Sequence, residues 1–168
     1  MLLTGLAAVS VIAAVLICLL GSVSFWWLPL LILGCFVGAA AIAFGFLWVM
    51  CAIVDFDKPQ EHDSKFYRFL AKIYIEALVP LVQVHIHKRG LEKLPKEGPY
   101  VMVCNHQSIA DPVMLLEAFP QAELTFISKK ENHDMFLIGK IMHKLMCQLI
   151  DRENDRQALK VILRCIQL

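Results

Sequence analysis

Apolar residues fill the first third of the chain without interruption by charge. Between residues 1 and 54 there is no Asp, Glu, Lys, Arg or His, and Asp55 is the first charged residue. A hydrocarbon core roughly 30 Å thick is crossed by about 20 helical residues, so this stretch is long enough for two spans. The pattern therefore predicts two transmembrane helices within residues 1–54.

The turn between these helices is predicted at the small residues 21–24. Trp26 and Trp27 follow the turn, and tryptophan favours the interface between membrane and water. We expect the helices to cover residues 2–20 and about 28–54, so that the chain enters and leaves the bilayer on one side. A cleavable secretory signal is the competing interpretation, but no positive side chain precedes the first apolar run.

Composition and charge agree with a membrane protein. The chain is 58% hydrophobic and its formal net charge is only +1, which gives no indication of a nucleic-acid partner. Basic residues follow the second helix whereas the loop between the helices has none, which favours a cytoplasmic position for the rest of the chain. These residues are Lys58, Lys65, Arg68 and Lys72. The six cysteines form no CxxC pair, so neither a disulfide framework nor a zinc site is indicated.

Residues 55–81 are predicted to be a linker followed by an amphipathic helix. Apolar residues 66, 69, 70, 73 and 77 share one helical stripe, with basic residues toward the other face. A helix of this kind either lies in the membrane interface with its basic face on anionic headgroups, or packs its stripe against the domain core. The pattern alone leaves both interpretations open.

Residues 82–168 form a single stretch in which strand and helix patterns alternate. In the strand predicted at 82–87, His85 and His87 share one face, which we interpret as a solvated face and not as a metal site. The alternation predicts an α/β layer domain with at least partly parallel strands. The other predicted strands lie at 100–104, 122–128 and 147–151, and the predicted helices begin near Pro112 and cover 135–146 and 154–168.

The motif CNHQSIADP, residues 104–112, places polar side chains at the carboxyl end of a predicted strand, where the sites of such sheets gather. If the helix begins near Asp111, its carboxylate can fold back toward the His106 imidazole. An Asp hydrogen-bonded to one ring nitrogen fixes the tautomer and leaves the other nitrogen free to accept a proton. However, Asp followed by Pro is also an ordinary start of a helix, so the spacing alone does not separate the two roles.

The surrounding sequence resembles the glycerophospholipid acyltransferases, specifically the 1-acylglycerol-3-phosphate acyltransferases. GLEKLPKEGPYVMVCNHQSIADPVMLL is similar to their first motif block, whose signature is Asn-His-x4-Asp, and FISKKENHDMFLIGKIMHKLMCQLIDREN is similar to their second, which ends in Ile-Asp-Arg. The resemblance implies a glycerolipid-acyltransferase-like α/β domain that is anchored in the membrane by the N-terminal hairpin.

The resemblance also implies an activity and roles for particular residues. A fatty acyl group would pass from acyl-CoA or an acyl carrier protein to the free hydroxyl of lysophosphatidate, giving phosphatidate, without a cofactor or metal. His106 would be the general base and Asp111 its orienting carboxylate. Arg152 and Lys129 would bind the substrate phosphate, and Asn105 belongs to the signature and is expected at the substrate site. Without the resemblance, Arg152 and Lys129 would be interpreted as surface charges.

The chain also departs from the family pattern. Nothing like the third block, Glu-Gly-Thr-Arg, follows Arg152, and the glycine expected before the Ile-Asp-Arg strand is replaced by Met146 and Cys147. We therefore expect a domain that is incomplete at its C-terminus and has little activity alone. The alternative function is a catalytically silent membrane-anchored module that binds lipid or a partner protein.

Overall fold

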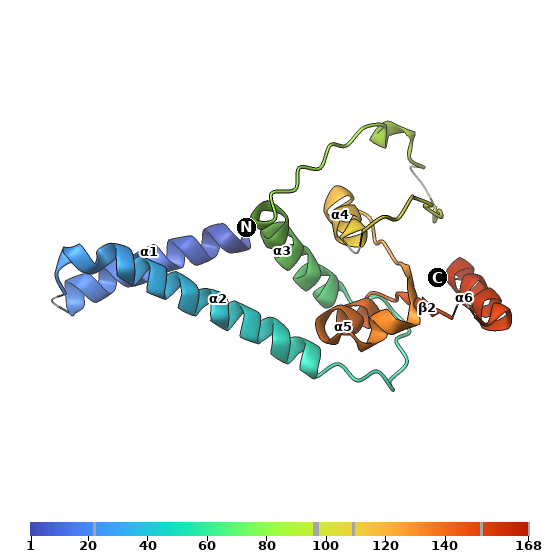
Figure 1. Ribbon diagram of the computed structural model, residues 1–168, viewed down its shortest axis with the longest axis horizontal. Coiled ribbons are helices and arrows are strands. Elements are labelled where there is room, and N and C mark those ends of the chain that lie inside the picture. The colour runs from blue at the N-terminus through green and yellow to red at the C-terminus, as the bar shows by residue number, and fades with distance from the viewer. Residues whose placement is uncertain (22, 96–97, 109, 152, 168) are drawn as a thin grey trace.

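The computed structural model describes residues 1–21, 23–95, 98–108, 110–151 and 153–167 (Figure 1). Most of these residues are helical. The helices are α1 (Leu2–Leu20), α2 (Leu28–Ala52), α3 (Lys65–Leu81), α4 (Asp111–Ala118), α5 (Phe136–Lys144) and α6 (Asp155–Gln167). Three short 3-10 turns, η1 (Phe25–Trp27), η2 (Leu91–Lys93) and η3 (Lys130–Asp134), and two strands, β1 (Ile127–Lys129) and β2 (Gln148–Ile150), complete the described elements.

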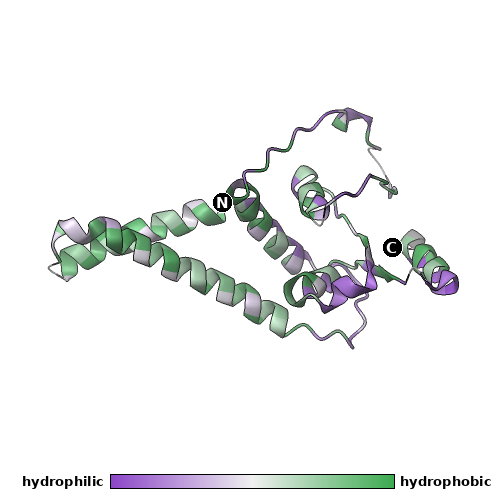
Figure 2. Cartoon of the chain, in the orientation of Figure 1, coloured by the Kyte–Doolittle hydropathy of each residue, from purple (hydrophilic) through white to green (hydrophobic). Residues whose placement is uncertain are grey.

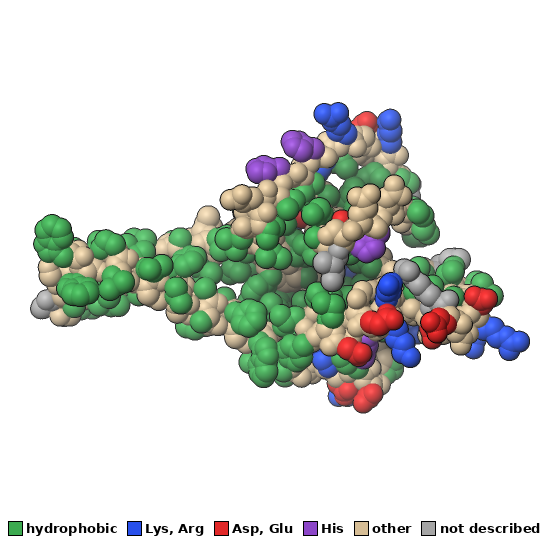
Figure 3. Space-filling view, in the orientation of Figure 1, with side chains coloured by type: hydrophobic (Ala, Val, Ile, Leu, Met, Phe, Trp, Pro, Cys, Tyr) green, Lys and Arg blue, Asp and Glu red, His purple; other side chains and the backbone are tan. Residues whose placement is uncertain are grey.

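Helices α1 and α2 form the hairpin that the sequence predicts. Both are apolar all round, so their outward surface is almost continuously hydrophobic (Figures 2 and 3). Trp26, at the loop end, is 92% exposed. The segments Leu2–Leu20 and Phe25–Ala52 are each long and apolar enough to cross a membrane. Exposed apolar surface of this extent is typical of a region that contacts lipid or another protein.

Helix α3 lies across the open end of the hairpin (Figure 1), where it contacts α1 and also bonds to the backbone of α2. It begins at Ser64, whose hydroxyl oxygen accepts a hydrogen bond from the backbone N–H of Tyr67. Tyr67 and Leu70 are buried in the protein core. The Tyr67 hydroxyl donates to the carbonyl oxygen of Met50 over 2.7 Å, and the Tyr74 hydroxyl donates to that of Ala43. One face of α3 therefore packs against α2.

The two interpretations of the amphipathic helix each describe one part of α3. Of the predicted apolar stripe, Leu70 and Ala77 are buried, as expected for packing on the core. Phe66 and Phe69 are 49% and 61% exposed and stay available for another environment. One part of the apolar stripe of α3 therefore packs against the protein core, and the other part is exposed on the surface.

The sheet is small and parallel. Strand β1 pairs with β2 in the register Ile127 with Gln148 and Lys129 with Ile150, and the crossover between them contains η3 and α5. Parallel strands need such a crossover, and the sequence predicts this order of strand, helix and strand. Both strands are shorter than the predicted ranges 122–128 and 147–151, and β1 begins only at Ile127.

The strands predicted at 82–87 and 100–104 are wrong. Residues 82–83 form the turn that ends α3, with Gln83 at a φ of 55°, and residues 84–87 and 100–104 have no regular secondary structure. Val101 and Val103 are 84% and 90% exposed. Alternating apolar residues favour an extended backbone, but a strand needs a neighbouring strand to accept and donate its backbone hydrogen bonds. Neither segment pairs with another among the described residues. The fold is thus mostly helical with one two-stranded parallel sheet.

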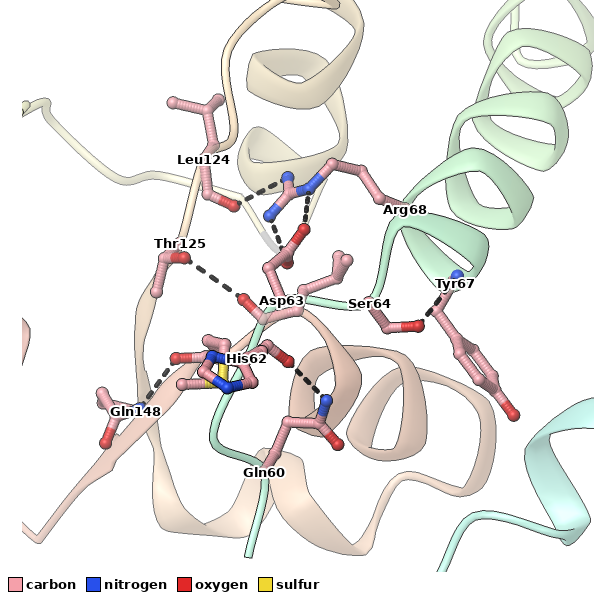
Figure 4. A network of polar contacts seen from close by, with 11 residues as sticks. Gln60, His62, Asp63, Ser64, Tyr67, Arg68, Leu124, Thr125 and Gln148 are labelled. Carbon is pink, nitrogen blue, oxygen red and sulfur yellow. Dashed lines mark hydrogen bonds and ion pairs between the residues drawn. The ribbon is translucent and has the colours of Figure 1, made fainter. Parts of the chain in front are cut away.

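The linker between α2 and α3 is fixed to the rest of the protein. Arg68 donates two hydrogen bonds to the Asp63 carboxylate, at 2.8 and 2.7 Å, and a third to the carbonyl oxygen of Leu124, just before β1 (Figure 4). The backbone N–H of Ser64 donates to the carbonyl oxygen of Lys144 at the end of α5. A bidentate Arg–carboxylate pair with a third acceptor has a well-defined geometry, so this end of the linker holds α3 against the sheet.

Candidate active site

The predicted His106–Asp111 pair forms in the structure. Asp111 is the first residue of α4, and Pro112 follows it in the first turn, where a missing backbone N–H costs nothing. His106 precedes the helix, on the exposed extended segment. The Nδ1 atom of His106 lies 2.9 Å from Oδ2 of Asp111, which is the distance of a charge-assisted hydrogen bond.

Asp111 also organises the turn that contains the histidine. Its Oδ2 atom accepts hydrogen bonds from the backbone N–H groups of Gln107, at 2.8 Å, and Ser108, at 3.0 Å. The Ser108 hydroxyl oxygen in turn accepts from the backbone N–H of Ala110 at 3.2 Å. The carboxylate therefore holds both the imidazole and the backbone that precedes α4.

These hydrogen bonds lower the pKa of Asp111 below its ordinary value of 3.8. The largest cause is the backbone N–H of Ser108, followed by that of Gln107 and by the His106 ring. A carboxyl whose pKa is lower in the folded than in the unfolded protein stabilises the folded state at a pH above the unfolded pKa. This stabilisation is lost as the pH falls through the lowered pKa of the folded protein. The turn is therefore expected to keep its geometry at every pH at which Asp111 is charged.

The pair is accessible from solvent. The His106 side chain is 60% exposed and that of Asp111 is 24% exposed. The carboxylate can only accept, so Nδ1 of a neutral His106 is the donor and Nε2 carries the lone pair. None of the described residues forms a hydrogen bond with Nε2. The arrangement presents an oriented imidazole whose free nitrogen can accept a proton from an incoming hydroxyl.

Helix α4 is positioned by α3. A groove between them is lined by Ala71 and Ile75 of α3, by Leu116 of α4 and by Phe119 just after α4, with Arg68, Lys72 and Glu117 also in its lining. The Lys88 ammonium donates to the carbonyl oxygen of Glu117 at 3.3 Å, near the C-terminal end of α4. Cations are favourable at this end of a helix. Asp111 thus sits on a helix that is held at its side by α3 and near its end by Lys88.

The other predicted site residues are not brought to the pair by any described contact. Lys129 is exposed at the end of β1, and Asn105 is exposed beside His106. No hydrogen bond or salt bridge among the described residues joins either of them to His106 or Asp111. Arg152, the predicted phosphate ligand, lies outside the described residues.

One kind of contact at the site was not predicted. The backbone donors of Gln107 and Ser108 have no side-chain signature, so only the Asp-Pro start of the helix could have indicated them. The Asp63–Arg68 pair, which lies in the linker outside the site, was not predicted either, because no motif contains it. Within the described residues, no three His, Cys, Asp or Glu side chains are arranged to hold a metal ion.

Comparison with known proteins places these residues in a family context. The acyltransferase family model matches residues 85–168, which is half of the chain and includes both motif blocks. A probable 1-acyl-sn-glycerol-3-phosphate acyltransferase of Mycoplasma pneumoniae is 32% identical over 122 residues, covering 66% of this chain and 45% of the relative. Another from Mycoplasma genitalium is 31% identical over 108 residues, covering 58% and 40%. The chain spans less than half the length of these relatives, and no solved structure matches it.

Proposed function

We propose that this chain, which belongs to the acyltransferase family, uses His106 as the general base of an acyl transfer, with Asp111 as its orienting carboxylate. The observation that carries the proposal is the 2.9 Å hydrogen bond between Nδ1 of His106 and Oδ2 of Asp111, which leaves Nε2 free. The choice of reaction is supported by the two Mycoplasma relatives, each of which is named a probable 1-acyl-sn-glycerol-3-phosphate acyltransferase.

In the proposed reaction, Nε2 of His106 takes the proton from the free hydroxyl of a 1-acyl-glycerol-3-phosphate. The hydroxyl oxygen forms a bond to the carbonyl carbon of an acyl thioester, and the carbon–sulfur bond then breaks. The imidazolium returns the proton to the leaving thiolate, so the products are phosphatidate and a free thiol. Asp111 stabilises the imidazolium between these two steps. The donor is acyl-CoA or an acyl carrier protein, and no cofactor or metal takes part.

The substrate phosphate is proposed to bind near the carboxyl ends of the two strands. Lys129 ends β1 beside Ile150 of β2, and Arg152 follows two residues later in sequence. An ammonium group supplies point charge to a phosphate, and a guanidinium can bind it in a bidentate manner. Asn105, next to the base, is proposed to contact the acceptor lipid.

The proposed location is the membrane, with α1 and α2 crossing the bilayer and the catalytic part on the cytoplasmic face. The two long apolar helices and the basic residues that follow α2 support this arrangement. The acceptor of the reaction is itself a lipid, so an enzyme held at the bilayer meets it at high local concentration.

Acyl transfer by the chain in lipid vesicles tests the proposal. We expect phosphatidate to form slowly from 1-acyl-glycerol-3-phosphate, and no product from a matched acceptor whose free hydroxyl is replaced by hydrogen. The reaction is run once with acyl-CoA as the donor and once with acyl carrier protein that carries a fatty acyl thioester. Phosphatidate no higher than in protein-free vesicles with both donors would contradict the proposal and favour a silent module.

A further inference from the structure

The C-terminal end of α2 belongs to the core of the folded domain. Leu47, Cys51 and Val54 form one buried cluster with Tyr67 and Leu70 of α3. Leu137 and Ile141 of α5 pack against the same cluster. The helix that the sequence predicts as a membrane span therefore continues into the protein core without a flexible tether.

The lengths of the two hairpin helices agree with this division. Helix α1 has 19 residues and α2 has 25, so α2 extends about 9 Å further at 1.5 Å per residue. A length of 19 residues, about 28 Å, already matches a hydrocarbon core of roughly 30 Å. The last six residues of α2, 47–52, contain its two buried side chains, Leu47 and Cys51. We call this end of α2, residues 47–52, the stalk.

Helix α5 holds the stalk through its polar side chains. The Lys140 ammonium donates to the carbonyl oxygen of Val54 at 2.7 Å and lies 3.7 Å from the centre of the Phe56 ring. A cation close to the C-terminal end of a helix meets the negative end of the helix dipole, and the aromatic face adds a cation–π contact. Lys140 thus binds the chain just where α2 ends.

The next turn of α5 also contacts the linker between α2 and α3. His143 Nε2 lies 3.1 Å from the carbonyl oxygen of Lys58, and the Lys144 ammonium donates to the Gln60 side-chain oxygen at 2.9 Å. The Phe56 ring also stacks on His133, with centroids 3.9 Å apart. We call these contacts of Lys140, His143 and Lys144 with residues 54–60 the clasp.

We propose that the clasp is a positioning device, which fixes the height of the His106–Asp111 pair above the bilayer. The proposal rests on the proposed acyl transfer and membrane location. The stalk packs on α3 through the buried cluster, and α3 packs on α4, which carries Asp111, so the position of the base follows that of the stalk. The acceptor hydroxyl lies at the depth that its own acyl chain sets, and a fixed base reaches it without extracting the lipid. Lys140 is the central positioning residue.

The substitution Lys140→Met tests the clasp, because methionine keeps an apolar side chain of similar length and removes the charge and the donor. Lys160→Met, at an exposed lysine of α6, is the matched control. Both proteins are compared with wild type in vesicles. The acceptors are a long-chain 1-acyl-glycerol-3-phosphate in the bilayer and a short-chain, water-soluble one.

We expect Lys140→Met to lower transfer to the bilayer acceptor roughly 10- to 100-fold, with the soluble acceptor within about twofold of wild type. Chymotrypsin cleavage of the linker after Phe56 is expected to rise about tenfold, because the Phe56 ring and the Val54 carbonyl lose their contacts with the Lys140 ammonium. Lys160→Met is expected to change neither rate. A loss of a merely structural contact would lower both transfer rates equally.

Equal losses for both acceptors, or unchanged transfer to the bilayer acceptor, would overturn the positioning role. If wild type transfers no acyl group to either acceptor, the proposed function fails, and linker cleavage then decides the clasp by itself. Cleavage of Lys140→Met at the wild-type rate would overturn the clasp in that case.

Discussion

Two regions of the protein are held together by different kinds of contact. The first is the junction, where the stalk packs against α3 and α5, and the second is the catalytic turn, which contains His106 and leads into α4. At the junction, side chains from α2, α3 and α5 share one buried cluster, and their contacts join residues as far apart as Val54 and Lys140. At the catalytic turn, one carboxylate oxygen of Asp111 accepts from three groups within five residues of sequence. Long-range burial maintains the first region, whereas local hydrogen bonds maintain the second.

Because of this difference, we expect substitutions at the junction to affect mainly stability and substitutions at the turn to affect mainly acyl transfer. Removal of a buried side chain leaves a cavity that the neighbours fill only partly, so changes at the junction are expected to lower the free energy of unfolding. Changes at exposed residues of the turn have little packing to lose. They are expected to reduce acyl transfer while leaving the fold intact.

The largest effect is expected for His106→Ala. Loss of a general base lowers a rate roughly 10²–10⁴-fold, while an exposed substitution changes the free energy of unfolding by less than about 0.5 kcal/mol. The measurements are acyl transfer in vesicles and thermal unfolding in detergent. His87→Ala, at an exposed histidine of the segment between α3 and η2, is the control and should keep the wild-type rate. Equal rates for the two variants would remove His106 from the mechanism.

The next effect is expected at the junction, where Leu70 is 5% exposed. Leu70→Ala should lower the free energy of unfolding by about 3 kcal/mol, because it deletes buried methyl groups and leaves a cavity. The matched change is Val103→Ala on the extended segment, where the side chain is 90% exposed and the expected loss is below about 0.5 kcal/mol. Denaturant unfolding followed by circular dichroism measures both. Similar losses at the two positions would show that the regions do not differ in packing.

The smallest effect concerns two cysteines and requires no mutation. Burial raises the pKa of the Cys147 thiol to about 11, whereas Cys104 is exposed on the extended segment. Alkylation needs the thiolate, and at pH 8 a pKa near 11 leaves on the order of one Cys147 thiol in a thousand ionised. Iodoacetamide labelling followed by peptide mapping should therefore modify Cys104 first and Cys147 slowly. Modification of Cys147 as fast as Cys104 would contradict its burial.

Much of this architecture follows from hydrophobic patterning. The absence of charge from residues 1–54 predicted the hairpin, and the stripe in residues 66–77 predicted α3, because both signals come from the helix itself. The strands at 82–87 and 100–104 were predicted wrongly for the converse reason. Their alternation specifies an extended backbone, but pairing depends on a partner elsewhere in the chain.

The candidate site was predictable only in part, for similar reasons. The spacing of His106 and Asp111 predicted their contact because the helix start at Asp111 is a local feature. The clasp was not predictable, since Lys140 and Val54 are 86 residues apart and neither belongs to a motif.

One departure from the family pattern has a visible consequence. Met146 adopts a left-handed conformation, with φ of 60°, at the position where the family resemblance led us to expect glycine nearby. Glycine adopts this conformation at little cost, whereas a side chain makes it unfavourable by about 1 kcal/mol or more. Met146 is 6% exposed, so burial of its side chain opposes this cost.

Proton abstraction by His106 requires that Asp111 hold the ring with Nε2 unprotonated. The 15N NMR spectrum of the His106 ring at pH 9, where an ordinary imidazole is neutral, measures this. We expect the tautomer protonated at Nδ1 in the wild type and the Nε2-protonated form to appear in Asp111→Ala. A wild-type ring protonated at Nε2 would rule out His106 as the base, because that nitrogen could not then accept the proton.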